Sequence, residues 1–95
     1  MRELCLKIYG RVQGVGFRRW TQKTAYAIGG VSGWVRNADD GTVEILARAE
    51  EEKMEKFIEA CQKGSLFSRV DHVDFLPSAP SYFLPPVTDG VFERI

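Results

Sequence analysis

A glycine-rich segment followed by an arginine contains the residue types that most suggest chemistry in this chain. Residues 10–18 read Gly-Arg-Val-Gln-Gly-Val-Gly-Phe-Arg, between an alternating apolar run and a helical pattern. Glycines allow successive backbone N–H groups to point into one concavity, and a following helix adds the positive end of its dipole. The guanidinium of Arg18 can donate two parallel hydrogen bonds to an anion. The segment therefore has the chemistry of a phosphate or carboxylate cradle.

Two known phosphate-binding motifs are excluded for this segment. No Gly-Lys-Ser/Thr follows it, as a Walker loop requires, and its spacing G-x-x-x-G-x-G differs from the dinucleotide-binding fingerprint. A structural alternative stays open, because a tight strand-to-helix connection can need glycine for steric reasons alone.

The chain has no net charge, but its charges are unevenly distributed. Residues 1–38 carry seven Lys or Arg and one acid, whereas residues 39–95 carry six Lys or Arg and twelve acids. The two parts therefore have net charges of +6 and −6. This pattern indicates either a local positive patch for an anion or ion pairs between the two halves across the fold.

The elements that must position the cradle follow from hydrophobic periodicity. Helical spacing predicts helices at residues 17–28 and 50–63, and Asp39-Asp40-Gly41 predicts a hairpin turn. Alternation predicts strands at residues 3–9, 31–37, 42–49, 69–76 and 91–95. The predicted fold is therefore α+β, a split βαβ (βαββαβ) sandwich with an antiparallel sheet and two helices on one face.

Length and composition are those of one globular domain covering residues 1–95. Hydrophobic residues make up 44% and charged residues 27%, which excludes disordered and low-complexity classes. No apolar run approaches the ~18 residues of a membrane span, and the N-terminus lacks the features of a secretory signal. Two cysteines make no disulfide framework, so we expect a cytoplasmic protein. No residues have metal-ligand spacing, so we expect no metal and no other cofactor.

Three motifs, in this order, resemble the acylphosphatase family. They are the segment 10–18, Gly-Trp-Val-Arg-Asn at 33–37 and Asp-Gly-Thr-Val-Glu at 40–44. The resemblance implies a ferredoxin-like fold, which agrees with the element order above. It also implies hydrolysis of the anhydride between a carboxylic or carbamic acid and phosphate, without a metal and without a phosphoenzyme.

The resemblance implies roles for individual residues. Arg18 matches the arginine that binds the phosphoryl group, and Asn37 matches the asparagine that positions the attacking water. The loop amides expected to hold the phosphoryl oxygens are those of Gln13, Gly14, Val15, Gly16 and Phe17. An acyl phosphate has a good carboxylate leaving group, so binding, orientation and charge stabilisation suffice without a catalytic acid or base.

Three departures from the family pattern accompany these motifs, and one is that the ending at residues 91–95 resembles the family's last strand only loosely. Between Arg18 and Gly33 the chain has one residue more than the resemblance leads us to expect, and Gly29-Gly30 is the obvious place for it. The proline-containing loop 77–90 is also unlike the expected pattern, and its segment 82–84 is placed over the core or beside the site.

Other conspicuous residues have structural interpretations. We expect His72 to be a solvent-facing strand residue and Cys61 to lie in the core stripe of the second helix. Cys5 is expected on the opposite side of its strand from the main core, and Trp20 and Trp34 are expected to pack rather than stack on a ligand.

Three further arginines lie near the motifs, and we assign none of them a primary catalytic role. Arg11 and Arg36 flank the motifs and add positive field, with direct ligand contact as the alternative. Arg19 follows Arg18 on another face of the helix, so we expect it to be exposed.

Two non-catalytic functions are the alternatives, namely RNA binding and small-anion binding by a ferredoxin-like module. RNA-recognition sheets need aromatic residues on the strands that face RNA, whereas residues 41–48 have none, and the K/R-G-F/Y signature is missing. The resemblance implies a small acyl phosphate as the substrate. We also expect a monomer that has neither a nucleic acid nor a membrane partner.

Overall fold

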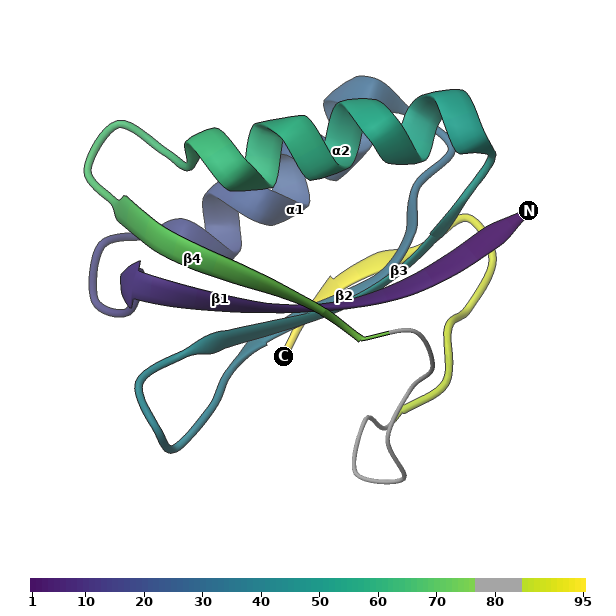
Figure 1. Cartoon of the computed structure of the whole chain (residues 1–95). Helices are drawn as coiled ribbons and strands as arrows, with labels where there is room; N and C mark the ends of the chain where they lie inside the picture. Colours follow the sequence, from purple (N-terminus) through teal and green to yellow (C-terminus); the bar gives the residue numbers. More distant parts are fainter. Residues whose placement is uncertain (77–84) are drawn as a thin grey trace.

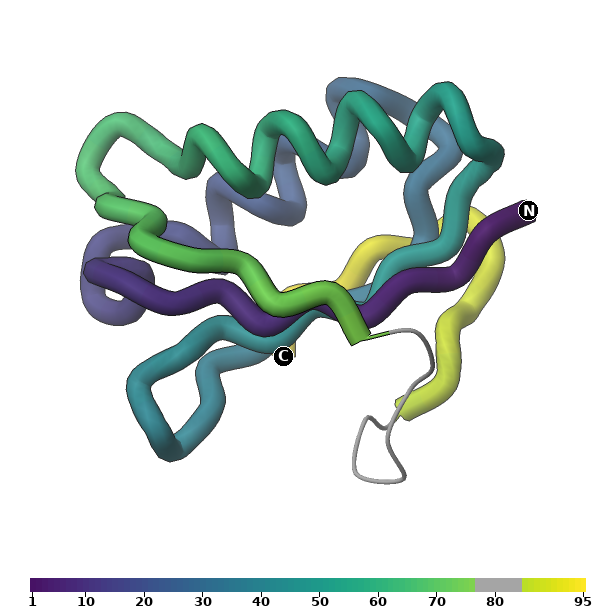
Figure 2. Tube along the Cα trace, in the orientation of Figure 1, coloured from purple at the N-terminus to yellow at the C-terminus, as the bar shows by residue number. Residues whose placement is uncertain are grey.

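A five-stranded sheet with two helices on one of its faces forms the fold (Figure 1). The computed structural model describes residues 1–76 and 85–95 of the chain. The elements are β1 (Arg2–Arg11), α1 (Phe17–Ile28), β2 (Ser32–Asn37), β3 (Val43–Ala49), α2 (Glu51–Lys63), β4 (Arg69–Leu76) and β5 (Phe92–Arg94). This order, with α1 and α2 running side by side across the sheet (Figure 2), is the predicted ferredoxin-like arrangement.

The strand order in the sheet is β4-β1-β3-β2-β5. The first four strands pair antiparallel, as the sequence predicts. The short β5 pairs parallel to β2, with Phe92 opposite Gly33, so the sheet is mixed rather than wholly antiparallel. The difference arises because β4 and β5 lie at opposite edges, a placement that local periodicity does not encode.

β1 extends to Arg11, two residues further than the alternation predicts. Gly10 and Arg11 continue the ladder with β4, across a register shift after Tyr9. A Cβ at Gly10 would lie 2.0 Å from the carbonyl oxygen of Arg69, and the φ angle of Gly10 is +130°. The first glycine of the motif is therefore required because two backbone segments approach closely in the sheet. For this glycine the steric explanation holds, rather than a role in an anion cradle.

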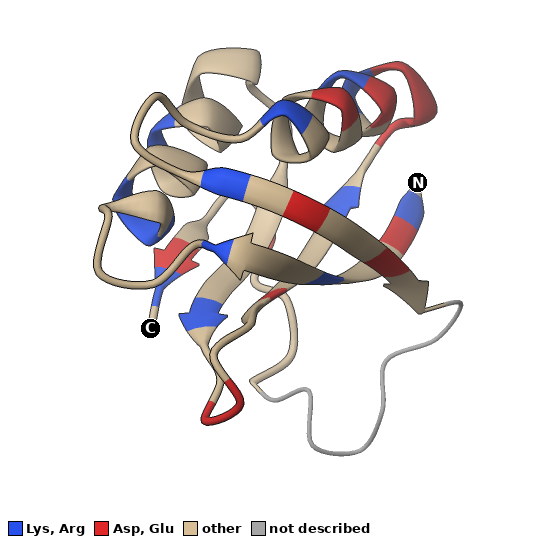
Figure 3. Cartoon of the chain, turned by 60° about the vertical axis from the view of Figure 1, so that its left-hand side comes forward, with Lys and Arg blue, Asp and Glu red and all other residues tan. Residues whose placement is uncertain are grey.

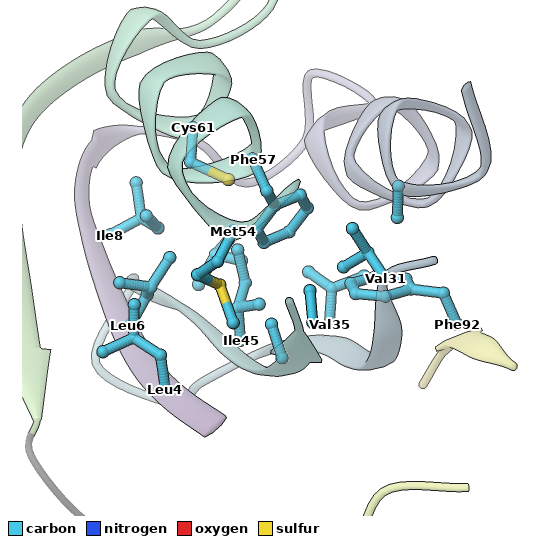
Figure 4. Close-up of a cluster of buried hydrophobic side chains, with 14 of the residues drawn as sticks. Leu4, Leu6, Ile8, Val31, Val35, Ile45, Met54, Phe57, Cys61 and Phe92 are labelled. Atoms are coloured by element: carbon cyan, nitrogen blue, oxygen red, sulfur yellow. The ribbon is translucent and has the colours of Figure 1, made fainter. Parts of the chain in front are cut away.

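The main core lies between the sheet and the helices (Figure 4). Alternate residues of the strands point toward the helices, and α2 contributes Met54, Phe57 and Cys61 at helical spacing. From α1, Phe17, Thr21 and Ala25 are buried, as the predicted stripe requires. This packing fixes the axis of α1, and with it the position of the loop that leads into the helix.

A small second cluster covers the opposite face of the sheet. Cys5, Trp34 and Leu46 are buried there, with Leu76 and Val87 packed against them. The indole N–H of Trp34 donates to the carbonyl oxygen of Pro85 at 2.6 Å. Cys5 therefore lies off the main core and Trp34 serves packing, as expected. The expectation for segment 82–84 falls outside the described residues.

Candidate active site

The loop between β1 and α1 spans residues 12–16, and its glycines are required for a different reason from that of Gly10 in β1. Gly14 and Gly16 have φ angles of +75° and +77°, and no described atom lies within 4 Å of a Cβ built on either residue. These glycines are therefore required by backbone conformation rather than by crowding, in contrast to Gly10. Their left-handed conformation turns the chain around a concavity at the start of α1.

The amides at the start of α1 are available to an anion. The first helical hydrogen bond runs from the N–H of Trp20 to the carbonyl oxygen of Gly16 at 3.0 Å, so the preceding N–H groups lack a helical acceptor. Gly16 caps the helix without a side-chain hydrogen bond, and the first turn contains no acid. The positive end of the helix dipole is therefore not neutralised by the chain itself.

Arg18 is held at this site by the far end of the described chain. Its Nη1 donates to the carbonyl oxygen of Ile95 at 2.8 Å, and the amide of Ile95 donates to the carbonyl oxygen of Val35 at 2.9 Å. An arginine has five N–H donors, so this contact fixes the guanidinium and leaves most of its donors available.

Asn37 ends β2, where it pairs with Val43 of β3, and its side chain is exposed. Within residues 1–76 and 85–95 the side-chain amide makes no hydrogen bond. The adjacent turn is closed by other groups, because the Ala38 amide donates to the Thr42 carbonyl oxygen at 2.9 Å. Asp40 also accepts from the amide and hydroxyl of Thr42. A purely turn-forming role for Asn37 is therefore not supported by these contacts.

Gln13 ties the glycine loop to the β2–β3 hairpin. Its side-chain amide donates to the carbonyl oxygens of Ala38 and Thr42, at 2.8 and 2.9 Å. Because Ala38 directly follows Asn37, these bonds set the distance between the loop and the asparagine. The motif suggested only a backbone role for Gln13, since the partners of its side chain are 25 and 29 residues away.

One pocket of about 270 Å³ joins these parts. It brings together Gly14, Gly16, Phe17, Arg18 and Asn37, all of which the sequence singles out. Two residues whose amides the sequence also singles out, Gln13 and Val15, are not among the lining residues. The Gln13 side chain donates to the hairpin, and Val15 lines a neighbouring groove. Its other lining residues are Val12, Arg19 and Arg94. Arg19 is exposed as expected but borders the pocket, and nothing in the sequence marks Arg94.

Ion pairs between the two halves, one of the two interpretations of the uneven charge distribution, are present in the structure. They include Arg2 with Glu51 at 2.7 Å and Lys7 with Asp40 at 2.8 Å. The hydrogen bond from Lys7, followed by those from Thr42, holds the pKa of Asp40 well below its usual range.

The cations near the cradle, unlike Arg2 and Lys7, are not paired with carboxylates of the described residues. Five of them make no ion pair with any described Asp or Glu: Arg11, Arg18, Arg19, Lys23 and Arg94. Lys and Arg positions appear in blue at the start of α1 and beside the C-terminal end in Figure 3. Positive charge without a carboxylate partner among the described residues therefore surrounds the pocket.

The other conspicuous residues have structural partners. Arg36 forms an ion pair with Glu44 at 2.9 Å and lies over the Trp34 ring, and neither Arg36 nor Arg11 lines the pocket. His72 is exposed, and its Nε2 lies 2.5 Å from an Asp74 carboxylate oxygen.

Both cysteines and Trp20 also have packing roles. Burial raises the pKa of the Cys5 thiol to about 11 and that of Cys61 further, so both thiols are neutral near pH 7. Trp20 packs against the core, with its ring centroid 5.2 Å from that of Phe17.

The fold and the site together define an α+β sandwich with a candidate anion cradle at its first strand-to-helix junction. The family model for acylphosphatase matches residues 4–83. This chain belongs to the acylphosphatase family, in agreement with the resemblance of the three motifs.

Individual relatives agree with this assignment. An acylphosphatase of Listeria welshimeri is 53% identical over 76 residues, covering 79% of this chain and 81% of the relative. An acylphosphatase of Nitratidesulfovibrio vulgaris is 52% identical over 66 residues, which are 70% of this chain but only 65% of the relative's length. The crystal structure of acylphosphatase from Bacillus subtilis superposes with a TM-score of 0.84 at 37% identity, covering 100% of this chain and 99% of that one.

Proposed function

We propose that this chain is an acylphosphatase, which hydrolyses the carboxyl–phosphate anhydride of small acyl phosphates to a carboxylate and inorganic phosphate. The observation that carries the proposal is that Arg18, Asn37 and the glycine loop line one pocket, in a chain of this family. The proposal treats residues 1–95 as a single acylphosphatase-like domain.

Phosphoryl binding is assigned to the loop and to Arg18. The amides of Gln13, Gly14, Val15, Gly16 and Phe17 are assigned to hold the phosphoryl oxygens, assisted by the helix dipole. The guanidinium of Arg18 donates to two of these oxygens as a planar fork, because its contact with Ile95 leaves several donors available. Together they neutralise the charge that the transition state spreads over the equatorial oxygens.

Water positioning is assigned to Asn37. A neutral amide cannot remove a proton at pH 7, but its oxygen can accept a hydrogen bond from a water and hold that water in line. The water oxygen bonds to phosphorus as the bond between phosphorus and the acyl oxygen breaks. The electron pair leaves with the carboxylate, and the water proton passes to solvent. Because a carboxylate is a good leaving group, no general acid is required.

The partner of the site is a small acyl phosphate, and we propose a cytoplasmic monomer without a nucleic acid or membrane partner. Trp34 is buried on the face of the sheet opposite the helices. This burial supports the absence of a nucleic acid partner, since RNA-recognition sheets present exposed aromatic rings on that face. No helix among the described residues is long and apolar enough to cross a bilayer.

Hydrolysis of acetyl phosphate by the purified protein should survive chelation. The proposed chemistry needs only the loop amides, Arg18 and Asn37, and no three His, Cys, Asp or Glu side chains converge in the described part of the chain. The measurement is phosphate release with and without EDTA. Loss of activity in EDTA that a divalent cation restores would contradict the metal-free mechanism.

Inorganic phosphate should inhibit hydrolysis competitively with the substrate. Both would occupy the loop and Arg18, so phosphate should raise KM and leave kcat unchanged. Initial rates over a grid of acetyl phosphate and phosphate concentrations test this. Purely non-competitive inhibition would place the anion site away from the loop.

A further inference from the structure

A second groove lies directly beside the candidate active site. It has a volume of about 340 Å³, and its apolar walls come from Val15, Trp20, Leu66 and Phe67. Val15 lies within the glycine loop and Trp20 belongs to α1, whereas the other two residues lie in the connection between α2 and β4. The groove is therefore built by α1 and by two loops that Figure 1 places at the same end of the molecule.

The apolar side chains of the α2–β4 connection are unusually exposed. Leu66 and Phe67 are 88% and 74% exposed, so neither contributes to either core cluster. Both side chains therefore leave most of their apolar surface in contact with water. A ligand that covered them would gain free energy from removing apolar surface from water.

The groove adjoins the phosphoryl pocket on the side away from Asn37. Gly16 and Arg19 line both spaces, whereas Asn37 lines only the pocket. In Figures 1 and 3 the β1–α1 loop lies between the β2–β3 hairpin, which carries Asn37, and the α2–β4 connection. An in-line displacement places the attacking water and the leaving group on opposite sides of phosphorus. With the water at Asn37, the acyl group therefore leaves toward the groove.

The charges around the groove fit an acyl group that departs as a carboxylate. Arg19 lies at the junction of the pocket and the groove, and Lys23 lines the groove one helical turn further along α1. Neither side chain makes an ion pair with any described residue. The negative charge that develops on the acyl oxygen would emerge beside these cations, and the apolar part of the acyl group would meet Trp20, Leu66 and Phe67.

We propose that this groove is the acyl-group subsite and that it favours acyl phosphates with a bulky apolar acyl group, such as an aromatic ring. The inference rests on the proposed function and specifies the substrate class for the same site. The reaction is unchanged: the bond between phosphorus and the acyl oxygen breaks, and the carboxylate departs along the groove.

The test compares benzoyl phosphate with acetyl phosphate on a variant that carries both Leu66→Ser and Phe67→Ser. We expect kcat/KM for benzoyl phosphate to fall about tenfold, chiefly through KM, because the lost contacts bind ground state and transition state alike. Acetyl phosphate is too short to reach these side chains, so its kcat/KM should stay within about twofold. The acetyl phosphate rate also reports that the variant is folded.

Phe75→Ser is the matched control. Phe75 is also exposed, at 44%, but lies on β4 outside the groove, so this change should leave the ratio between the two substrates unaltered. An unaltered ratio in the double variant would overturn the subsite while the proposed function stands. If the wild-type protein hydrolysed neither substrate, the proposed function itself would fail.

Discussion

Replacing Arg18 by alanine should nearly abolish both hydrolysis of acetyl phosphate and binding of inorganic phosphate. Two charge-assisted hydrogen bonds contribute about 3–6 kcal/mol together, which corresponds to a loss of roughly 10²–10⁴-fold. The loop amides remain in the variant, but none of them carries a charge that could replace the guanidinium. The measurement is kcat/KM beside a phosphate titration by calorimetry.

Arg18→Lys distinguishes the planar fork from positive charge alone. An ammonium supplies the charge but not two parallel donors, so this variant should also be severely impaired. Near-wild-type rates for the lysine variant would contradict the bidentate contact. Arg69→Ala is the control, because Arg69 is an exposed arginine of β4 that does not line the pocket. It should leave both activity and phosphate affinity unchanged.

Replacing Asn37 by alanine should lower kcat by about 10²-fold or more, the scale of removing one preorganised polar group. Phosphate affinity should stay near its wild-type value, because Arg18 and the loop amides are untouched. The urea midpoint should change little, since the turn is closed by Asp40 and Thr42 and the Asn37 side chain is exposed.

Three measurements on the same variant separate the two roles of Asn37. Turnover, phosphate titration and urea unfolding should show the loss in turnover alone. Normal turnover with a lowered midpoint would make Asn37 a turn residue and leave the attacking water without an identified holder. Asp39→Ala changes an exposed neighbour in the same turn and should affect none of the three.

Much of the fold could be predicted because its signals are local. The helix at Phe17–Ile28 and the strand at Arg69–Leu76 have the predicted bounds, since periodicity and flanking turn residues define both. The parallel pairing of Phe92 with Gly33 had no such signal. It depends on the chain crossing from one sheet edge to the other, and no short window of sequence encodes that path.

In the candidate site, too, the sequence predicts the residues that belong to local motifs but not the contacts between distant parts of the chain. Arg18 and Asn37 belong to contiguous motifs, so the sequence identifies both, and the structure places them in one pocket. The contact of Arg18 with Ile95 spans 77 positions, and the Gln13 side chain meets a hairpin more than twenty positions away. Arg94 enters the pocket only because β5 docks beside β2. These contacts follow from tertiary packing, which periodicity and spacing do not report.

The docking of β5 against α1 also links ligand affinity to folding. Three hydrogen bonds join α1 to β5 and to the residue that follows it: from Arg18 to Ile95, from Gln22 to Phe92, and from Phe92 to the hydroxyl of Tyr26, each across at least 66 positions. Contacts of this sequence separation require the closure of a long loop, so they are made in the folded chain and lost in the unfolded one. An anion that binds the ordered arginine but not the unfolded chain therefore stabilises the whole fold by mass action. Phosphate in the surroundings would act as a folding ligand for this chain as well as a product.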